Sequence, residues 1–256
     1  MDLEWCGMGM SGRAGELWNQ TKKKKFMFIV LEGVDGSGKS TQIEKLREMF
    51  EERGVASEYI HFPRFEAPFF GELIARFLRG ELGGINEVDP YIVAMLYAGD
   101  RRDAAALIRR WLDTGKVVIA DRYVYSNIGY QCAKVADAAR REELRRWIFD
   151  LEYEYFKIPQ PDISIFLDVP FAFTERKLAE AREGADREYL RGGRDIHESS
   201  LEFQKSVRDV YLDAVRHDHD LHVVDCSAAG EAMASPDEVF ARIRSLVNRY
   251  VDRIGR

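Results

Sequence analysis

One stretch decides the fold of this 256-residue chain: Gly33-Val34-Asp35-Gly36-Ser37-Gly38-Lys39-Ser40. It matches the pattern G-x-x-x-x-G-K-[ST], follows an apolar run at residues 26–31, and precedes a helical pattern over residues 39–53. The glycines allow a tight turn in which successive backbone N–H groups point at one oxyanion. The N-terminus of the following helix adds a partial positive charge. The stretch therefore predicts a phosphate-binding loop between a first strand and a first helix.

The same loop predicts how a nucleoside triphosphate and a metal ion are held. We expect Lys39 to reach the β- and γ-phosphates and the Ser40 hydroxyl to bind Mg²⁺. A second apolar run, residues 117–120, ends at Asp121, and parallel strands share one carboxyl edge. An aspartate there can also cap a helix, but the nearby loop favours metal binding. The residues expected to hold the triphosphate are Gly33, Gly36, Ser37, Gly38, Lys39, Ser40 and Thr41.

Apolar runs alternate with helical patterns along the rest of the chain. Short, continuous runs rich in Val, Ile and Phe are typical of strands covered on both faces. The expected strands are 26–31, 57–62, 117–120, 163–167 and 221–224. The expected helices are 42–53, 68–79, 90–113, 125–132, 140–156, 171–182, 199–217 and 236–253. This order predicts an α/β fold of three layers, in which helices cover both faces of a five-stranded, mainly parallel sheet.

The domain organisation follows from the same pass along the chain. Residues 1–25 carry no clean period and are expected to form a poorly ordered extension, whereas 26–256 are expected to form a single domain. Residues 182–194 read REGADREYLRGGR, which is too polar for a core. This segment is either an exposed charged loop or part of a flexible lid, at about 182–198, that brings guanidinium groups onto phosphates.

Composition excludes several classes of protein. The net charge of −6 is the opposite of the basic surplus expected of a nucleic-acid binder. Three cysteines without short spacing argue against a disulfide framework and favour a reducing compartment, which predicts a cytoplasmic protein. No run approaches the roughly 20 apolar residues that cross a bilayer, so no membrane association is expected.

Two helical segments carry residues that suit a second nucleotide. Tyr97 and Arg101 are four apart in the helix expected at 90–113, and Asn127 and Tyr130 are three apart after Arg122. An aromatic ring can stack on a base while a guanidinium donates to a carbonyl oxygen. The same spacing also fits an ordinary surface pair, so the spacing alone leaves both interpretations open.

The chain from residue 26 onward resembles the thymidylate kinases, a family of P-loop nucleoside-monophosphate kinases. The resemblance rests on four segments in the family's order: 32–41; 62–64 with 71–74 and 78–81; 121–127 with 130–131; and 167–170. It implies that ATP, with Mg²⁺, phosphorylates dTMP to dTDP, a step in dTTP synthesis. The apolar helix at 90–113 and its neighbours also suit the face of a homodimer.

The resemblance implies roles at the phosphate end of the acceptor site. Arg122 matches the arginine that grips the acceptor phosphate, and Arg64 matches a second arginine near it. Asp35 matches an acidic loop residue near the sugar 3′-hydroxyl and the metal. The full substrate site implied by the resemblance is Asp35, Phe62, Arg64, Tyr97, Arg101, Arg122, Ser126, Asn127, Tyr130 and Gln131.

At the base end, Tyr97 matches the ring that stacks on thymine, and Arg101 the arginine that faces a thymine carbonyl. Asn127 matches a contact to the base edge. Tyr130 matches the ring packed where a ribose 2′-hydroxyl would clash, which favours deoxyribose.

Two departures from the family pattern concern catalysis. Some members place an arginine inside the phosphate loop, where this chain has Gly36, so the catalytic positive charge is expected from the lid. After the lid the chain reads Asp-Ile-His-Glu at 195–198, where many relatives have Asp-Arg-x-Glu. Which lid arginine reaches the transferred group therefore stays open. The catalytic residues expected are Lys39, Asp35, Arg122, Arg187, Arg191 and Arg194.

Two alternatives remain at this point. The chain could phosphorylate another nucleoside monophosphate or a free deoxynucleoside, although Arg122 as a phosphate clamp favours a monophosphate. It could also be a P-loop switch or binding module that depends on a nucleotide. A guanine-selective switch should carry an Asn/Thr-Lys-x-Asp motif, which the sequence lacks.

Overall fold

A computed structural model of the chain describes residues 27–179, 185–191, 195–197, 200–229 and 232–254. The extension expected at residues 1–25 lies outside these ranges. No helix among the described residues is long and apolar enough to cross a membrane.

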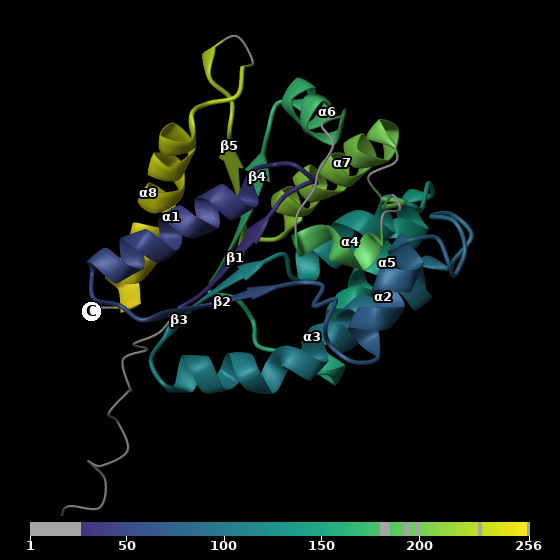
Figure 1. Cartoon of the computed structure of the whole chain (residues 1–256), viewed down its shortest axis with the longest axis horizontal. Helices are drawn as coiled ribbons and strands as arrows, with labels where there is room; N and C mark the ends of the chain where they lie inside the picture. The colour runs from purple at the N-terminus through teal and green to yellow at the C-terminus, as the bar shows by residue number, and fades with distance from the viewer. Residues whose placement is uncertain (1–26, 180–184, 192–194, 198–199, 230–231, 255–256) are drawn as a thin grey trace, which may run out of the picture.

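Five parallel strands form the centre of the molecule (Figure 1). They are β1 (Phe28–Glu32), β2 (Ser57–His61), β3 (Val117–Asp121), β4 (Ile163–Asp168) and β5 (Leu221–Asp225). Their order across the sheet is β2-β3-β1-β4-β5, and every pairing is parallel. All five strands lie where the apolar runs predicted them, and the expected mainly parallel sheet is confirmed.

Helices cover both faces of the sheet, as expected. In Figure 1, α1 (Lys39–Glu52) and α8 (Pro236–Ile254) lie on one side of the strands. On the other side lie α3 (Pro90–Asp113), α4 (Val124–Cys132) and α7 (Leu201–His217). The remaining helical elements are α2 (Phe70–Leu78), α5 (Ala138–Phe149), the π-helical turn η1 (Asp150–Tyr155), α6 (Phe171–Ala179) and the 3₁₀ turn η2 (Ala185–Leu190).

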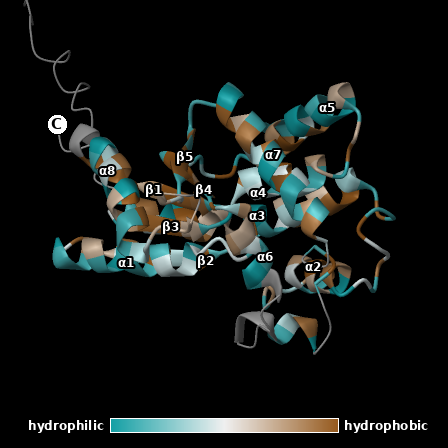
Figure 2. Ribbon diagram, turned by 90° about the horizontal axis from the view of Figure 1, so that it is seen from above, coloured by the Kyte–Doolittle hydropathy of each residue, from teal (hydrophilic) through white to brown (hydrophobic). Residues whose placement is uncertain are grey.

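The core lies between these layers. Every residue of β1 and β3 is buried, and Figure 2 shows hydrophobic strands enclosed by helices with hydrophilic outer faces. Burial of a strand on both faces removes the alternation of polar and apolar residues, which is why these strands appear as continuous apolar runs. The register pairs Leu31 with Asp121 and Glu32 with Phe166, so β1 and β3 end within one residue of each other and β4 runs two residues further. Residues that follow these strands therefore share one edge of the sheet.

A local sequence signal accounts for the start of α8, and two segments differ from expectation. Ser235 and Glu238 exchange capping hydrogen bonds at the start of α8, which is the reciprocal arrangement of a capping box. The helix expected at 140–156 is instead α5 followed by the π-helical turn η1, because an i, i+4 pattern cannot reveal one inserted residue. The segment expected as a charged loop or lid contains a short 3₁₀ turn, η2.

Candidate active site

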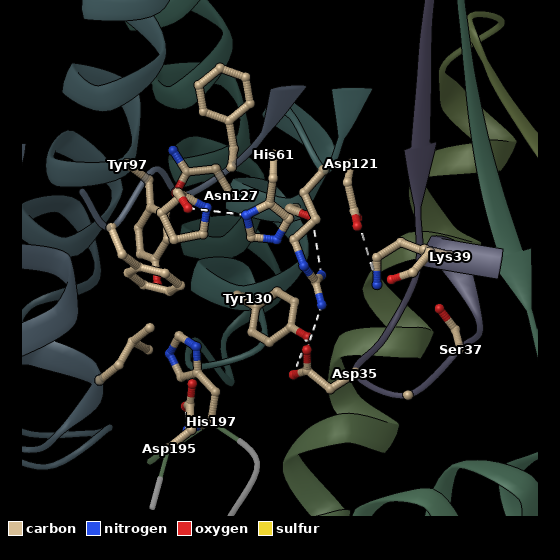
Figure 3. Close-up of a pocket in the computed structure, with 18 of the residues that line it drawn as sticks. Asp35, Ser37, Lys39, His61, Tyr97, Asp121, Asn127, Tyr130, Asp195 and His197 are labelled. Carbon is tan, nitrogen blue, oxygen red and sulfur yellow. Dashed lines mark hydrogen bonds and ion pairs between the residues drawn. The ribbon is translucent and has the colours of Figure 1, made fainter. Parts of the chain in front are cut away.

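A cavity of about 440 Å³ opens at the carboxyl edge of the sheet (Figure 3). It runs from the phosphate-binding loop, past the end of β3, to α3, α4 and three further residues, Tyr189, Asp195 and His197. The sequence-predicted residues that line it are Asp35, Gly36, Ser37, Gly38, Lys39, Ser40, Thr41, Phe62, Tyr97, Arg101, Asp121, Arg122, Ser126, Asn127, Tyr130 and Gln131. The fold therefore brings most of the expected site together around one space.

The phosphate-binding loop has the conformation that its glycines allow. Gly36 and Gly38 have φ angles of 75° and 83°, which side chains other than glycine rarely adopt, and α1 begins directly after Gly38. The Lys39 ammonium donates to the backbone carbonyls of Gly33 and Val34, at 3.4 and 3.3 Å. Burial, with the nearby charge of Arg122, lowers the pKa of Lys39 to about 8. The loop thus holds an ammonium group at its centre, where an anion would partner it.

Two polar atoms beside the loop are buried without a hydrogen-bond partner among the described residues: Ser37 Oγ and Asp121 Oδ1. The Lys39 ammonium lies 4.0 Å from that Asp121 oxygen, while Ser40 is exposed at the start of α1. Buried polar atoms normally have a hydrogen-bond partner, so these two atoms indicate a ligand-binding site. A carboxylate and a hydroxyl suit Mg²⁺, which usually takes few protein oxygens together with substrate phosphates. Within the described part of the chain, no group of three or more His, Cys, Asp or Glu is placed to hold a metal ion.

Arg122 joins the phosphate-binding loop to the rest of the cavity. Its guanidinium donates Nη1 to the Gly33 carbonyl at 2.8 Å and Nη2 to Asp35 Oδ1 at 2.5 Å. Its backbone has a φ of 67°, a strained value for a residue with a side chain. Strain of this kind persists only where the surrounding structure enforces it, and it is common at functional sites. Arg122 is therefore held with its cation facing the cavity.

Asp35 is the centre of a second set of contacts. Its Oδ2 accepts from the Tyr130 hydroxyl at 2.7 Å and from Gln204 Nε2 at 3.0 Å. Burial alone would raise the pKa of Asp35, but the charges of Arg122 and Lys39 outweigh it and hold the pKa well below its usual range. The carboxylate is therefore ionised throughout the neutral range.

At the opposite end of the cavity, α3 and α4 supply Tyr97, Arg101 and Asn127. The buried Arg101 guanidinium forms a two-point pair with Glu152 of η1, with Nε–Oε2 and Nη2–Oε1 distances of 2.5 and 2.6 Å. Asn127 Nδ2 donates to the same carboxylate at 3.0 Å. These side chains offer hydrogen-bonding groups beside an aromatic ring, which is the chemistry that recognises a base.

Two residues expected at the phosphate-binding loop and the acceptor site, Gly33 and Arg64, do not line the cavity. Gly33 contributes its carbonyl to the contacts of Lys39 and Arg122 instead. The Arg64 guanidinium donates to Asp100 Oδ1 and Asp103 Oδ2, both at 2.8 Å, so these contacts hold it beside α3.

The described residues of the segment expected as a lid include some that the sequence did not single out. Tyr189 stacks on Phe65 with ring centroids 3.7 Å apart, and His197 packs against Tyr130 with centroids 5.0 Å apart. Tyr189, Asp195 and His197 all line the cavity. Burial, with the charge of Lys134, holds the pKa of His197 well below its ordinary value. The departure from the family pattern at 195–198 was the signal that could have pointed to His197.

The lid arginines are only partly described. Arg191 is exposed with a φ of 49°, and it is not among the residues that line the cavity. The backbone of Arg187 belongs to η2. Arg194 lies outside the described residues.

A buried carboxylic acid beneath the phosphate-binding loop was also not predicted from the sequence. Glu32, at the end of β1, is fully buried and accepts from Ser126 Oγ at 2.6 Å and from the Tyr211 hydroxyl at 2.9 Å. Ser126 in turn accepts from Arg122 Nη1 at 3.3 Å, so Glu32 supports Arg122 through one intermediate side chain. Burial raises the pKa of Glu32, although those hydrogen bonds oppose the shift.

The parallel sheet, the phosphate-binding loop after β1 and the carboxylate at the end of β3 define a P-loop nucleotide-binding protein. Comparison with known proteins narrows the class. The sequence model of the thymidylate kinase family matches residues 31–235, and the chain belongs to that family. It is thus an enzyme of the nucleoside-monophosphate kinase class, and the predicted membership is confirmed.

Individual relatives agree with this assignment. A probable thymidylate kinase of Thermococcus onnurineus is 34% identical over 229 residues, which cover 86% of this chain and 97% of the relative. The thymidylate kinase of Mycobacterium tuberculosis is 32% identical over 188 residues, which cover 73% of this chain and 85% of the relative. The solved structure of thymidylate kinase from Candida albicans superposes with a TM-score of 0.65 at 23% identity, covering 89% of this chain and 93% of that one, which supports the fold.

Proposed function

We propose that the chain transfers the γ-phosphoryl group of ATP to the 5′-phosphate of dTMP, giving dTDP and ADP as a step in dTTP synthesis. One observation carries the proposal: a single cavity is lined both by the phosphate-binding loop and by Tyr97, Arg101 and Asn127, with Arg122 between them. A switch or ATPase needs only the first half of such a cavity. A kinase for nucleoside monophosphates needs both halves.

At the donor end, we assign the triphosphate to the loop amides and to Lys39. In this structure the Lys39 ammonium donates to two loop carbonyls. Oxygens of a bound phosphate would replace these carbonyls as acceptors. Burial strengthens its attraction for a phosphate because little water screens the charge. Lys39 thus neutralises charge that develops on the transferred group.

We assign a bound Mg²⁺ to Ser40 and Asp121, with the unpartnered Asp121 Oδ1 as the observation in favour. When bound, Mg²⁺ supplies charge neutralisation and alignment to the phosphate oxygens. The Ser37 hydroxyl, buried and unpartnered beside it, is available to a phosphate oxygen.

At the acceptor end, we assign the acceptor phosphate to Arg122, with Arg64 as a second, more distant cation. An acceptor phosphate is already an anion, so the reaction needs no strong general base. Arg122 orients that phosphate while its contact with Asp35 fixes the guanidinium plane. Asp35, held ionised, and the Tyr130 ring above it form the sugar site and select deoxyribose.

The lid supplies closure. Tyr189 and His197 already line the cavity, so closure over bound nucleotides excludes water and limits wasteful hydrolysis of ATP. Because Gly36 leaves the phosphate loop without an arginine, we assign the catalytic positive charge to Arg187, Arg191 or Arg194.

Two properties of the whole molecule complete the proposal. Ile92 and Met95 of α3 are 49% and 42% exposed, which supports a homodimer that covers this face. Free, buried cysteines at 132 and 226 support a reducing compartment, and we infer the cytoplasm. Light scattering of the purified protein measures its oligomeric state directly and so tests the homodimer.

The test of function measures ADP formed from ATP with no acceptor, with dTMP, and with dUMP, dCMP, dAMP, dGMP and thymidine. We expect strong stimulation by dTMP and a low rate without an acceptor. Turnover that does not depend on any acceptor would establish an ATPase or switch instead, and a preference for another monophosphate would change the assigned substrate.

A further inference from the structure

The buried carboxylate of Glu152 holds both polar side chains at the base end of the cavity. Glu152 lies in η1, is fully buried, and does not itself line the cavity. It accepts from Arg101 of α3 through Nε and Nη2, and from Asn127 of α4 through Nδ2. One side chain from a third element therefore fixes two cavity-lining side chains from two helices. A π-helical turn at this point is typical of a functional site.

The contacts of Asn127 leave only one orientation of its amide. Nδ2 donates both to Glu152 Oε1 and to the carbonyl of Ala94, each at 3.0 Å. Both partners are acceptors, so a turned amide would set its oxygen against two oxygens. Oδ1 is consequently the free group of Asn127. This oxygen is buried and has no hydrogen-bond partner among the described residues, which indicates that a donor group of a bound ligand pairs with it.

Arg101 is fixed in the same way. Its pair with Glu152 uses Nε and Nη2, so Nη1 is the amino group outside the pair. A guanidinium only donates. The base end thus offers an acceptor from Asn127 and a donor from Arg101.

This pattern matches one kind of base edge. Thymine and uracil carry an imide, in which the N3–H donor lies between two carbonyl acceptors. Cytosine carries an acceptor at N3, which opposes Asn127 Oδ1, and an amino donor at N4, which opposes an Arg101 donor that faces the 4-position. Mismatched buried polar groups remain unpaired, which is the strongest source of discrimination in an enzyme site.

We propose that Glu152 is the positioning residue that makes this site selective for imide bases over cytosine. The inference rests on the proposed function and deepens it, because it names the residue that sets which base the acceptor carries. Glu152 acts through Asn127 and Arg101 without contacting the substrate. It does not distinguish thymine from uracil, since both present the same imide edge.

The decisive variant is Glu152→Gln. A glutamine amide must direct its own NH₂ group either at Arg101 Nε or at Arg101 Nη2 and Asn127 Nδ2 together. All of these groups donate, so Arg101 reorients in either case, and Asn127 loses its partner in the second. We expect kcat/KM to fall about 10- to 100-fold for dTMP and equally for dUMP, the range for lost hydrogen bonds to a charged group. For dCMP the loss should be smaller, so the dTMP-to-dCMP ratio falls at least about tenfold. The KM for ATP should stay within about twofold of the parent, because Glu152 does not contact the phosphate-binding loop.

Two further variants separate selectivity from folding. Glu142→Gln makes the same chemical change in the two-point pair of Glu142 with Arg145 on α5, away from the cavity, and should leave the dTMP-to-dCMP ratio unchanged. Glu152→Asp keeps the negative charge beside Arg101, but its shorter side chain moves the carboxylate away from Arg101 and Asn127. This variant therefore tests the positioning role of Glu152 even if the glutamine variant does not fold. We expect the aspartate variant to bind ATP normally and to show a reduced ratio.

The outcomes distinguish this inference from the proposed function. A parent enzyme that no acceptor stimulates overturns the proposed function. A parent enzyme that is active and selective, with Glu152→Gln and Glu152→Asp variants that retain its dTMP-to-dCMP ratio, overturns the role of Glu152 alone.

Discussion

Arg122 Nη2 lies 2.5 Å from Asp35 Oδ1, so the residue after β3 is bonded directly to the phosphate-binding loop after β1. The two residues are 87 positions apart, and adjacency of β1 and β3 in the sheet brings them together. The same guanidinium has its Cζ 5.2 Å from the centre of the Tyr130 ring. The loop proposed to bind the donor and the cation proposed to face the acceptor are thus joined by one ion pair.

Replacement of Arg122 should therefore affect the acceptor reaction. We expect Arg122→Ala to lower kcat/KM for dTMP by at least ~2 kcal/mol, about 30-fold, the scale for a lost charged anchor. Arg122→Lys should recover only part of this loss, because an ammonium lacks the planar fork that binds Asp35 and a phosphate together. Steady-state kinetics with varied dTMP measure the effect. Arg146→Ala, on the exposed face of α5, is the control, and an Arg122→Ala enzyme as efficient as the parent would remove Arg122 from the site.

Tyr130 should control the choice between deoxyribose and ribose. Its ring lines the cavity and its hydroxyl donates to Asp35 Oδ2 at 2.7 Å. Tyr130→Ala opens the space beside the sugar, so we expect the preference for dTMP over ribothymidine 5′-monophosphate to fall. Tyr130→Phe keeps the ring and should keep that preference, while losing some activity with the hydrogen bond. Competition assays with both acceptors test this, and equal selectivity in all three enzymes would contradict it.

Gly129 should be intolerant of any side chain. A Cβ there would meet Cε2 of Tyr211 at 2.8 Å, and the buried Tyr211 hydroxyl is bonded to Glu32 and Ser126. Overpacking of this kind costs about 1–3 kcal/mol, so we expect Gly129→Ala to lower Tm by roughly 3–10 °C. Gly84→Ala is the matched control, because its Cβ would come no closer than 3.4 Å to Glu87. Calorimetry that finds equal Tm values for the two variants would contradict the packing argument.

Sequence patterns predicted the features of this molecule that depend on residues close together in the chain. The strands are continuous apolar runs because both faces of the sheet are covered, and the phosphate-binding loop is a contiguous motif. Residues that follow the ends of adjacent strands, such as Asp35, Asp121 and Arg122, could then be assigned to one edge. Their assignment needed only the parallel sheet.

Buried polar partners could not be predicted in this way. Glu152 is 51 residues from Arg101 and lies in a stretch whose charges look like an exposed helix face. Glu32 follows the expected strand and entered the sequence prediction only as the first residue of the family segment 32–41. Nothing in a helical period shows that one of several acids is buried against a distant arginine, because that depends on how α3, α4 and η1 pack. The contribution of His197 depends likewise on how the residues around it pack against the cavity.

The buried ammonium of Lys39 should give the reaction with ATP an alkaline limit. Its pKa is lowered to about 8, so the group is charged below pH 8 and becomes neutral as the pH rises through that value. Only the charged form attracts phosphate, and kcat/KM for ATP reports ionisations of the free enzyme. We therefore expect kcat/KM for ATP to decline above about pH 8, whereas kcat at saturating ATP should stay flat, because bound phosphate keeps the lysine protonated. Lys39→Arg, which cannot lose its charge, should be less active but should lack this decline. A parent profile that is level from about pH 7 to 9.5, or an identical decline in the arginine variant, would show that Lys39 does not set the limit.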